Sequence, residues 1–114
     1  MIKLYGIPNC DTVKKARVWL TENDFAYEWH DFKKQGLSAE IVEQWLTMID
    51  WQQLINKQGT TWRKLDEASK ASVIDAASAT AIMLTNPSVI KRPVLDHAGK
   101  ISVGFKAEIY SSLF

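Results

Sequence analysis

The hydrophobic pattern at the start of the chain predicts a strand, a helix and a second strand. Residues 2–5 form a short apolar block that ends in a turn containing glycine, proline and asparagine. Residues 11–23 carry apolar side chains at helical spacing, and residues 25–31 alternate between apolar and polar positions, as strands do. A strand, a helix and a strand in close succession form a βαβ unit, so we expect the two strands to be parallel.

The middle of the chain predicts a series of helices. Ser38 is a candidate N-cap for a helix whose apolar positions continue to residue 49. Asp50 and Gln53 resemble a capping box at the start of a short helix. Helical composition then resumes in short pieces and stops at Asn86–Pro87. These further helical segments are 62–65, 72–76 and 78–84.

The last part of the chain predicts a hairpin and a closing helix. Two short apolar segments, 93–96 and 100–103, flank a turn that contains glycine, and a helical segment covers 105–114. The order β-α-β, helices, β-β-α predicts an α/β fold with a thioredoxin-like mixed sheet. We expect one domain over residues 1–114, with a helical insertion at about 38–87.

Composition restricts the possible function classes. The chain has 114 residues, a net charge of +1 and one cysteine. The small net charge gives no electrostatic case for direct nucleic-acid binding or for membrane binding, and the chain contains no long apolar stretch. One cysteine excludes an intramolecular disulfide and a cysteine-based zinc site, and it fits a reducing compartment. We expect a cytoplasmic protein with no metal site and no tightly bound cofactor.

The single cysteine, Cys10, stands between the first predicted strand and the first predicted helix. Unpaired backbone N–H groups and the helix dipole favour an anion at such a helix N-terminus. The thiolate is the reactive form of cysteine, so this position indicates redox or nucleophilic chemistry. Asp11 adds an opposing negative charge, which Lys14 and Lys15 offset. The alternative is that Cys10 is simply a small buried apolar residue.

Several known cysteine sites do not fit the surrounding sequence. A Cys-x-x-Cys redox pair would need a second cysteine at Val13, so any resolving thiol must come from another molecule. A Cys-x5-Arg phosphate loop would need an arginine at Ala16. A Cys–His hydrolase would need His30 or His97 as its base, and the pattern places these at a strand end and a hairpin tip. Incidental roles are favoured for both histidines.

Two arginines are candidates for binding an anion near Cys10. Arg63 follows a polar loop that contains Gly59, and Arg92 precedes Pro93 at the start of the second half of the predicted sheet. An arginine side chain binds a carboxylate or oxyanion through two parallel hydrogen bonds, although each arginine taken singly is more typical of a solvated surface. A helix terminus stabilises an exposed anion by only about 0.3–1 kcal/mol, so a reactive Cys10 needs an arginine close to its sulfur.

Three segments together resemble the ArsC/Spx family of thioredoxin-like proteins. They are Tyr5–Thr12, Gly59–Leu65 and Lys91–Pro93, and the resemblance covers the whole chain. It is strongest to the small YffB-like bacterial members. The resemblance implies a redox-active Cys10, an oxyanion held by arginines that match Arg63 and Arg92, and a cis peptide bond before Pro93.

The family also suggests the reaction. In its arsenate reductases the cysteine attacks the oxyanion, and glutathione and glutaredoxin complete the reduction. This chain lacks their third anion-binding arginine after the last strand, where Lys106 offers charge without the planar two-pronged geometry. YffB-like members are described as glutathione-dependent thiol reductases, and the resemblance favours this function, with glutathione as co-substrate and glutaredoxin as a further partner. We then expect catalytic roles for Cys10, Arg63 and Arg92, and substrate binding by Asn9, Thr12, Val13, Lys14, Pro93 and Lys106.

Three alternatives stay open. The first is arsenate reduction. The second comes from the Spx branch, whose members are redox-responsive regulators that bind the C-terminal domain of the RNA polymerase α subunit; Spx carries the Cys-x-x-Cys pair that Val13 removes here. The third is a non-enzymatic binding module that uses Trp45, Trp51 and Trp62 of the helical insertion as anchors, although core packing is the commoner role of such residues.

Overall fold

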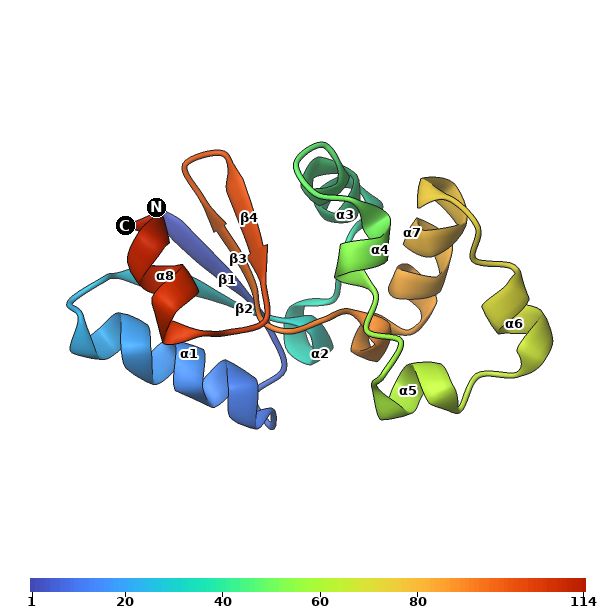
Figure 1. Ribbon diagram of the computed structural model, residues 1–114, viewed down its shortest axis with the longest axis horizontal. Helices are drawn as coiled ribbons and strands as arrows, with labels where there is room; N and C mark the ends of the chain where they lie inside the picture. The colour runs from blue at the N-terminus through green and yellow to red at the C-terminus, as the bar shows by residue number, and fades with distance from the viewer. The chain divides into compact units, whose positions relative to one another are not determined.

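The computed structural model covers residues 1–114, which fold as two units (Figure 1). Unit 1 consists of residues 1–36 and 92–114, and unit 2 consists of residues 37–91. The fold is a mixed α/β structure, as the sequence predicts. None of its helices combines the length and the apolar character that a membrane span requires.

Unit 1 is built on a four-stranded mixed sheet with the order β2-β1-β3-β4. Its strands are β1 (Ile2–Gly6), β2 (Tyr27–Asp31), β3 (Val94–His97) and β4 (Lys100–Val103). β1 pairs in parallel with β2 and in antiparallel with β3, which confirms the βαβ unit. β3 and β4 form the expected antiparallel hairpin.

Residues 98 and 99 form the tight turn that connects β3 and β4. Ala98 and Gly99 both have positive φ angles, 51° and 74°. A two-residue turn of type I′ requires this left-handed conformation at both central positions, and its twist matches that of the flanking strands. The turn fixes the pairing of His97 with Lys100 and therefore the register of β4.

Three helices belong to unit 1: α1 (Asp11–Glu22), α2 (Phe32–Gln35) and α8 (Ala107–Leu113). α1 and α8 cover the same face of the sheet, because residues of both helices join strand residues in one core cluster. The buried members of this cluster are Ile2, Leu4, Ala16, Leu20, Leu95 and Tyr110.

Unit 2 consists of short helices. They are α3 (Ala39–Leu46), α4 (Trp51–Leu54), α5 (Thr60–Arg63), α6 (Glu67–Ala71) and α7 (Ala76–Thr85), followed by the 3₁₀ turn η1 (Pro87–Val89). The segment after α4 pairs with the last residues of the unit through an isolated antiparallel bridge between Ile55 and Ile90. The N–H of Asn56 donates to the carbonyl of Val89 at 2.8 Å, which reinforces this pairing.

Side-chain caps define where several of these helices begin. The hydroxyl of Ser38 accepts a hydrogen bond from the N–H of Ile41 at 3.2 Å, which confirms the predicted N-cap of α3. Asp50 also caps α4 as predicted, but its carboxylate accepts from the N–H of Gln52 at 2.7 Å and not from Gln53. The capping box expected from Asp50 and Gln53 is therefore wrong.

The capping box of this chain lies at the start of α7. The carboxylate of Asp75 accepts from the N–H of Ser78 at 2.8 Å, while the hydroxyl of Ser78 accepts from the N–H of Asp75 at 3.0 Å. Because this reciprocal cap starts a helix at Ala76, the helix predicted over 72–76 is wrong. Asp75 is fully extended there, with φ −154° and ψ −179°.

Candidate functional site

The end of β1 packs tightly against the first turn of α1. A Cβ atom placed on Gly6 would lie 3.0 Å from Cγ2 of Val13 and 3.5 Å from Cη2 of Trp29. The side chain of Val13 is completely buried. Glycine at position 6 therefore permits a close approach that holds the start of α1, and with it Cys10, against the end of the sheet.

Cys10 occupies the N-cap position of α1. Its backbone is extended, with φ −125° and ψ 123°, and its side chain makes no capping hydrogen bond. The side chain is half-buried and so does not belong to the core. The first hydrogen bond of the helix runs from the N–H of Lys14 to the carbonyl of Cys10 at 2.9 Å. The backbone N–H groups of residues 11–13 precede this bond and lie where an anion is favoured.

Arg92 and Pro93 lie at the same end of the sheet. Tyr5 of β1 pairs with Val94 of β3, so the residue before Val94 stands beside the end of β1. The Arg92–Pro93 peptide bond is cis, as the resemblance implies, and the carbonyl of Pro93 accepts from the N–H of Gly104 at 3.0 Å. Unit 1 thus brings the loop that carries Cys10 and the Arg92–Pro93 segment to one end of one sheet.

Basic residues flank α1 on the side of α8. Lys106 is the exposed N-cap residue of α8 and makes no side-chain cap. The residues on either side of it line a hollow of about 380 Å³ together with Lys14 and Lys15 of α1. The backbone therefore carries Lys106 close to α1, and its part in anion binding stays a prediction.

The other expected substrate-binding residues differ in exposure. Asn9 and Lys14 are exposed, and Thr12 is half-buried. Because the side chain of Val13 is inside the core, only its backbone N–H is left to contact a ligand. Sequence alone did not separate these roles.

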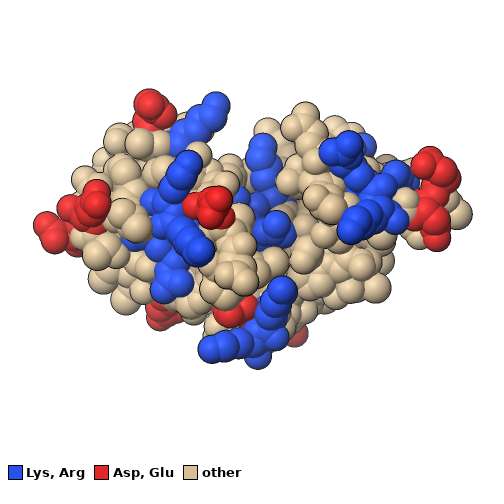
Figure 2. Space-filling view, turned by 90° about the horizontal axis from the view of Figure 1, so that it is seen from below, with Lys and Arg blue, Asp and Glu red and all other residues tan.

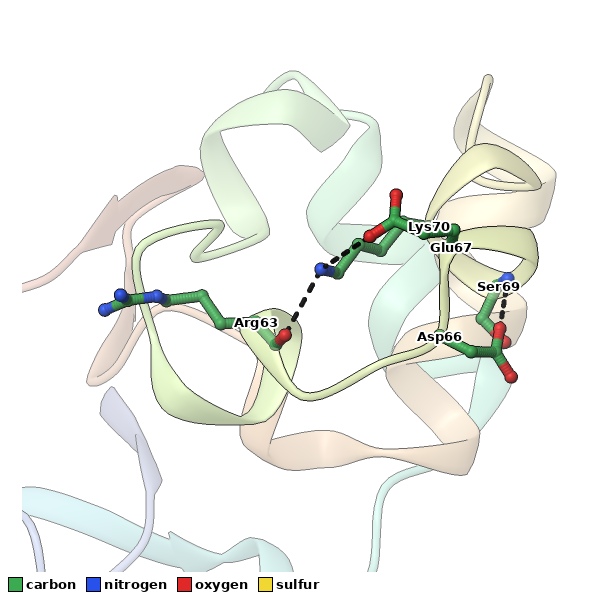
Figure 3. A network of polar contacts seen from close by, with 5 residues as sticks. All are labelled: Arg63, Asp66, Glu67, Ser69 and Lys70. Atoms are coloured by element: carbon green, nitrogen blue, oxygen red, sulfur yellow. Dashed lines mark hydrogen bonds and ion pairs between the residues drawn. The ribbon is translucent and has the colours of Figure 1, made fainter.

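Arg63 is the last residue of α5 and belongs to unit 2. It is exposed, whereas Trp62 beside it is buried. The carbonyl of Arg63 accepts a hydrogen bond from Nζ of Lys70 at 3.2 Å, and this Nζ lies 3.6 Å from a carboxylate oxygen of Glu67. Figure 3 shows that the guanidinium of Arg63 points away from this network. The participation of Arg63 beside Cys10 stays a prediction.

Neither histidine is arranged as a catalytic base for Cys10. Nε2 of His30 lies 2.7 Å from the carbonyl of Gly36 and donates to it in the corresponding tautomer. His97 ends β3, at the opposite end of the sheet from the Arg92–Pro93 segment, and its ring packs 5.0 Å from that of Phe114. The geometry therefore gives no support to a Cys–His hydrolase.

The proposed tryptophan anchors of unit 2 are mostly core residues. Trp45 is 1% exposed and Trp62 is 8% exposed, so neither forms a surface anchor. Trp51 is half-buried. The binding-module hypothesis loses two of its three anchors, and the commoner role in core packing holds for both.

One buried polar residue beside the site was missed by sequence reasoning. Asp31 ends β2 opposite Gly6 and is only 4% exposed. Its carboxylate accepts from the N–H of Lys33 at 2.8 Å and caps α2, while the side-chain carbonyl of Gln35 accepts from the N–H of Asp31 at 2.9 Å. Aspartate is a preferred N-cap residue, and Asp31 at the end of the alternating segment is the signal that could have indicated this cap. No three His, Cys, Asp or Glu side chains gather into a metal-binding group.

Comparison with known proteins identifies relatives across the whole chain. A protein of Haemophilus influenzae that carries no functional name is 42% identical over 100% of this chain and 99% of its own length. The global transcriptional regulator Spx of Streptococcus agalactiae is 28% identical over 95% of this chain and 79% of its own length.

Solved structures of similar proteins also match almost the whole chain. The protein called YffB is 49% identical, with a TM-score of 0.93 over 98% of this chain and 97% of its own. A protein of Brucella melitensis described as related to arsenate reductase (ArsC) is 50% identical, with a TM-score of 0.77 over 97% of this chain and 92% of its own. These matches confirm the thioredoxin-like fold.

The model of the ArsC family matches residues 5–113, a range that includes Cys10, Arg63 and Arg92. The family match and the relatives agree over almost the full length of the chain. This chain is a member of the ArsC family.

Proposed function

We propose that this protein is a glutathione-dependent thiol reductase that uses Cys10 as its only redox residue. The observation that carries the proposal is the start of α1. Cys10 stands there without a side-chain cap, at the end of the sheet that also holds the cis Arg92–Pro93 bond. Thiol exchange requires a thiolate that is accessible and stabilised by nearby positive groups.

The reaction proceeds in two thiol–disulfide exchanges. The Cys10 thiolate attacks the glutathione sulfur of a mixed disulfide R–S–S–G, which forms a Cys10–glutathione disulfide and releases the thiolate of R, which takes a proton from solvent. The thiolate of a second glutathione then attacks the glutathione sulfur on Cys10. This step releases oxidised glutathione and regenerates the Cys10 thiolate. The chain has one cysteine, so an external thiol must perform the second step.

The residues around Cys10 suit the charge of glutathione. Glutathione carries two carboxylates, which the N–H groups at the start of α1 and an arginine can bind. In the proposed site Arg92 stabilises the thiolate or a carboxylate, and Lys14 and Lys106 add positive charge, while a role for Arg63 stays a prediction of the family resemblance. Asn9 and Pro93 shape the backbone on which glutathione lies.

The test is a turnover assay with a glutathionylated peptide and excess glutathione. We expect release of the peptide thiol and one glutathione adduct per chain by mass spectrometry, both lost in Cys10→Ser. Arg92→Gln should lower turnover at least about ten-fold, because it removes a two-pronged charged donor. Lys91→Gln, which removes an exposed charge next in sequence, is the matched control and should turn over normally. Equal turnover of Cys10→Ser and the unaltered chain would refute the proposal.

Arsenate reduction is the second candidate, and the similarity to the Brucella melitensis protein favours it. Here Cys10 would attack arsenate, and two molecules of glutathione would supply two electrons to give arsenite, oxidised glutathione and water. Position 106 distinguishes the candidates, since Lys106 lacks the fork of an arginine. Arsenate turnover with glutathione and glutaredoxin, increased by Lys106→Arg, would place this reaction above thiol reduction.

A regulatory role is the third candidate, and the Spx relatives favour it. Binding to the C-terminal domain of the RNA polymerase α subunit would be its readout. A disulfide switch between positions 10 and 13 is impossible in this chain, because Val13 holds the second position and is buried. Retention of the chain on immobilised α-subunit domain, together with an inactive Cys10 in the turnover assay, would favour the regulator.

A further inference from the structure

One face of α1 carries a basic, an apolar and an acidic residue in a row. Lys14, Val18 and Glu22 follow one another at intervals of four residues, so their side chains lie along one side of the helix. All three are exposed, and Val18 is 53% exposed although it is apolar. We name these three residues the α1 stripe.

The α1 stripe forms a ridge between two hollows. The hollow of about 380 Å³ on the side of α8 is lined by residues of the stripe together with Trp19 and Phe105. A second hollow of about 330 Å³ is lined by Arg17, Val18, Thr21 and Glu22. Val18 and Glu22 line both hollows, so a ridge with the apolar Val18 at its centre and a recess on either side faces solvent.

Charge is distributed unequally along this face. Lys14 and Lys15 lie before Val18, and Glu22 lies after it, with Asp24 just beyond the end of α1. α1 lies along the lower side of unit 1 in Figure 1, and Figure 2 shows the molecule from below. There, basic side chains gather over the middle of this part of the molecule with one acidic patch among them, and further acidic side chains lie at its left-hand, upper and lower edges.

This distribution is complementary to itself when two α1 helices run antiparallel. If the two copies of Val18 meet on a twofold axis, Lys14 of each copy lies opposite Glu22 of the other. Two apolar side chains then meet at the centre, with an ion pair on either side. Lys15 lies opposite the neutral Thr21, and Asp11 extends beyond the last turn of the opposing helix.

We propose that the α1 stripe is a self-association surface, through which two copies of this chain form a symmetric antiparallel dimer. The occupant is a second copy and not another protein, because the charge order of the stripe matches its own reverse. The contact centres on one helix per copy and is small, so association is weak and reversible. High salt weakens it, since the flanking pairs are exposed.

The dimer keeps the two copies of Cys10 far apart. Cys10 precedes Val18 by eight residues, so the two sulfurs lie about 24 Å apart along the helix axis at about 1.5 Å per residue. A disulfide between the copies is excluded in this arrangement. Association should therefore persist in reducing agent, which separates it from oxidation of Cys10.

The test measures molecular mass by sedimentation equilibrium in reducing buffer, between about 10 µM and 1 mM protein. We expect the mass of the unaltered chain to rise with concentration. Val18→Asp, Lys14→Glu and Glu22→Lys should each raise the Kd at least about ten-fold, because they place like charges or a buried charge in the contact. Lys100→Glu, which makes the same charge change outside α1, is the matched control and should associate normally.

A mixing experiment tests the antiparallel pairing itself. Lys14→Glu and Glu22→Lys each oppose like charges in a homodimer, but an equal mixture of the two variants restores both opposite-charge pairs. The mixture should therefore associate like the unaltered chain, as should the chain that carries both substitutions. An unaltered chain that stays monomeric at about 1 mM, or a mixture that stays as monomeric as its components, overturns the proposal. Helical content by circular dichroism confirms that each variant is folded.

Discussion

Most helices of unit 2 begin with a side-chain cap, whereas in unit 1 only α2 does. In unit 2, a side chain caps α3, α4, α6 and α7, and the capping residues are Ser38, Asp50, Asp66 and Asp75. In unit 1, Asp31 caps α2, while α1 at Cys10 and α8 at Lys106 begin with no side-chain cap. A capped terminus has already used its first amides for its own stability, whereas the open terminus of α1 leaves them for a thiolate or a ligand. The contrast separates helix starts that stabilise the fold from the start of α1, which carries the chemistry in the proposed function.

The exception in unit 2 supports this distinction. α5 begins at Gly59 without a side-chain cap and ends at Arg63. This segment is one of the three that carry the family resemblance. The uncapped starts of α1 and α5 therefore coincide with family motifs, whereas the uncapped start of α8 does not.

The largest expected effect comes from disturbing the support of the open terminus. Gly6→Val forces new methyl groups toward Val13 and should lower the free energy of unfolding by about 3 kcal/mol. It should also slow alkylation of Cys10, because α1 can no longer approach β1. Chemical denaturation and alkylation rates measure the two effects.

A second substitution shows whether contact with Val13 causes the effect. Val13→Ala removes the methyl groups that Gly6→Val approaches, so the double variant should be more stable than the sum of the single effects predicts. Strict additivity would show that position 6 acts through something other than the packing of α1.

The next effect concerns a capped terminus. Asp75→Ala removes the capping box of α7 and should lower Tm by about 4–8 °C. Asp75→Asn retains an accepting oxygen and should lose less. Turnover at a temperature where each variant is folded should not change, because Asp75 supports the fold and lies outside the proposed site.

A substitution in the core of unit 1 is expected to increase the stability of the fold by a smaller amount. Tyr110 is completely buried, and its hydroxyl has no hydrogen-bond partner. Burial raises the pKa of this hydroxyl, so it stays neutral at any pH where the protein is studied. Tyr110→Phe removes an unsatisfied polar atom and should stabilise the fold by about 1 kcal/mol, measured as a higher denaturant midpoint. Marked destabilisation would mean that the hydroxyl is satisfied.

The smallest expected effect is a change in how folding stability depends on pH in acid. Hydrogen bonds from Ser69 and Ser78 hold the pKa values of Asp66 and Asp75 below their ordinary value of 3.8. Such carboxylates stabilise the folded state above that value, and this contribution is lost as the pH falls through their lower folded values. Stability below about pH 4 should therefore decline less steeply in a chain that carries asparagine at both positions. If the stability of this variant declined as steeply as that of the unaltered chain, other carboxylates would cause the acid sensitivity.

Local sequence patterns predicted local structure, but they missed features that depend on contacts with other parts of the chain. Cys10 at a helix start and Ser38 as an N-cap follow from spacing and residue type, and both are observed. The segment 72–76 has helical composition, but the reciprocal bonds between Asp75 and Ser78 override it. The burial of Val13 against Gly6 depends on strand and helix packing, which no local pattern encodes. The pairing that sets Arg92 beside the end of β1 joins residues far apart in sequence, and only the family resemblance anticipated it.

The most direct test of the account follows the amide resonances of residues 11–13 by NMR while Cys10 is ionised by raising the pH. An open N-terminus that stabilises the thiolate predicts that these resonances shift together as Cys10 ionises, and that Cys10→Ser abolishes the shift. The capped amides of Gln52 and Ser78 should not move. The claim that this helix start is the redox centre would be contradicted if the resonances of residues 11–13 did not shift when Cys10 ionises. It would also be contradicted if they shifted equally in Cys10→Ser.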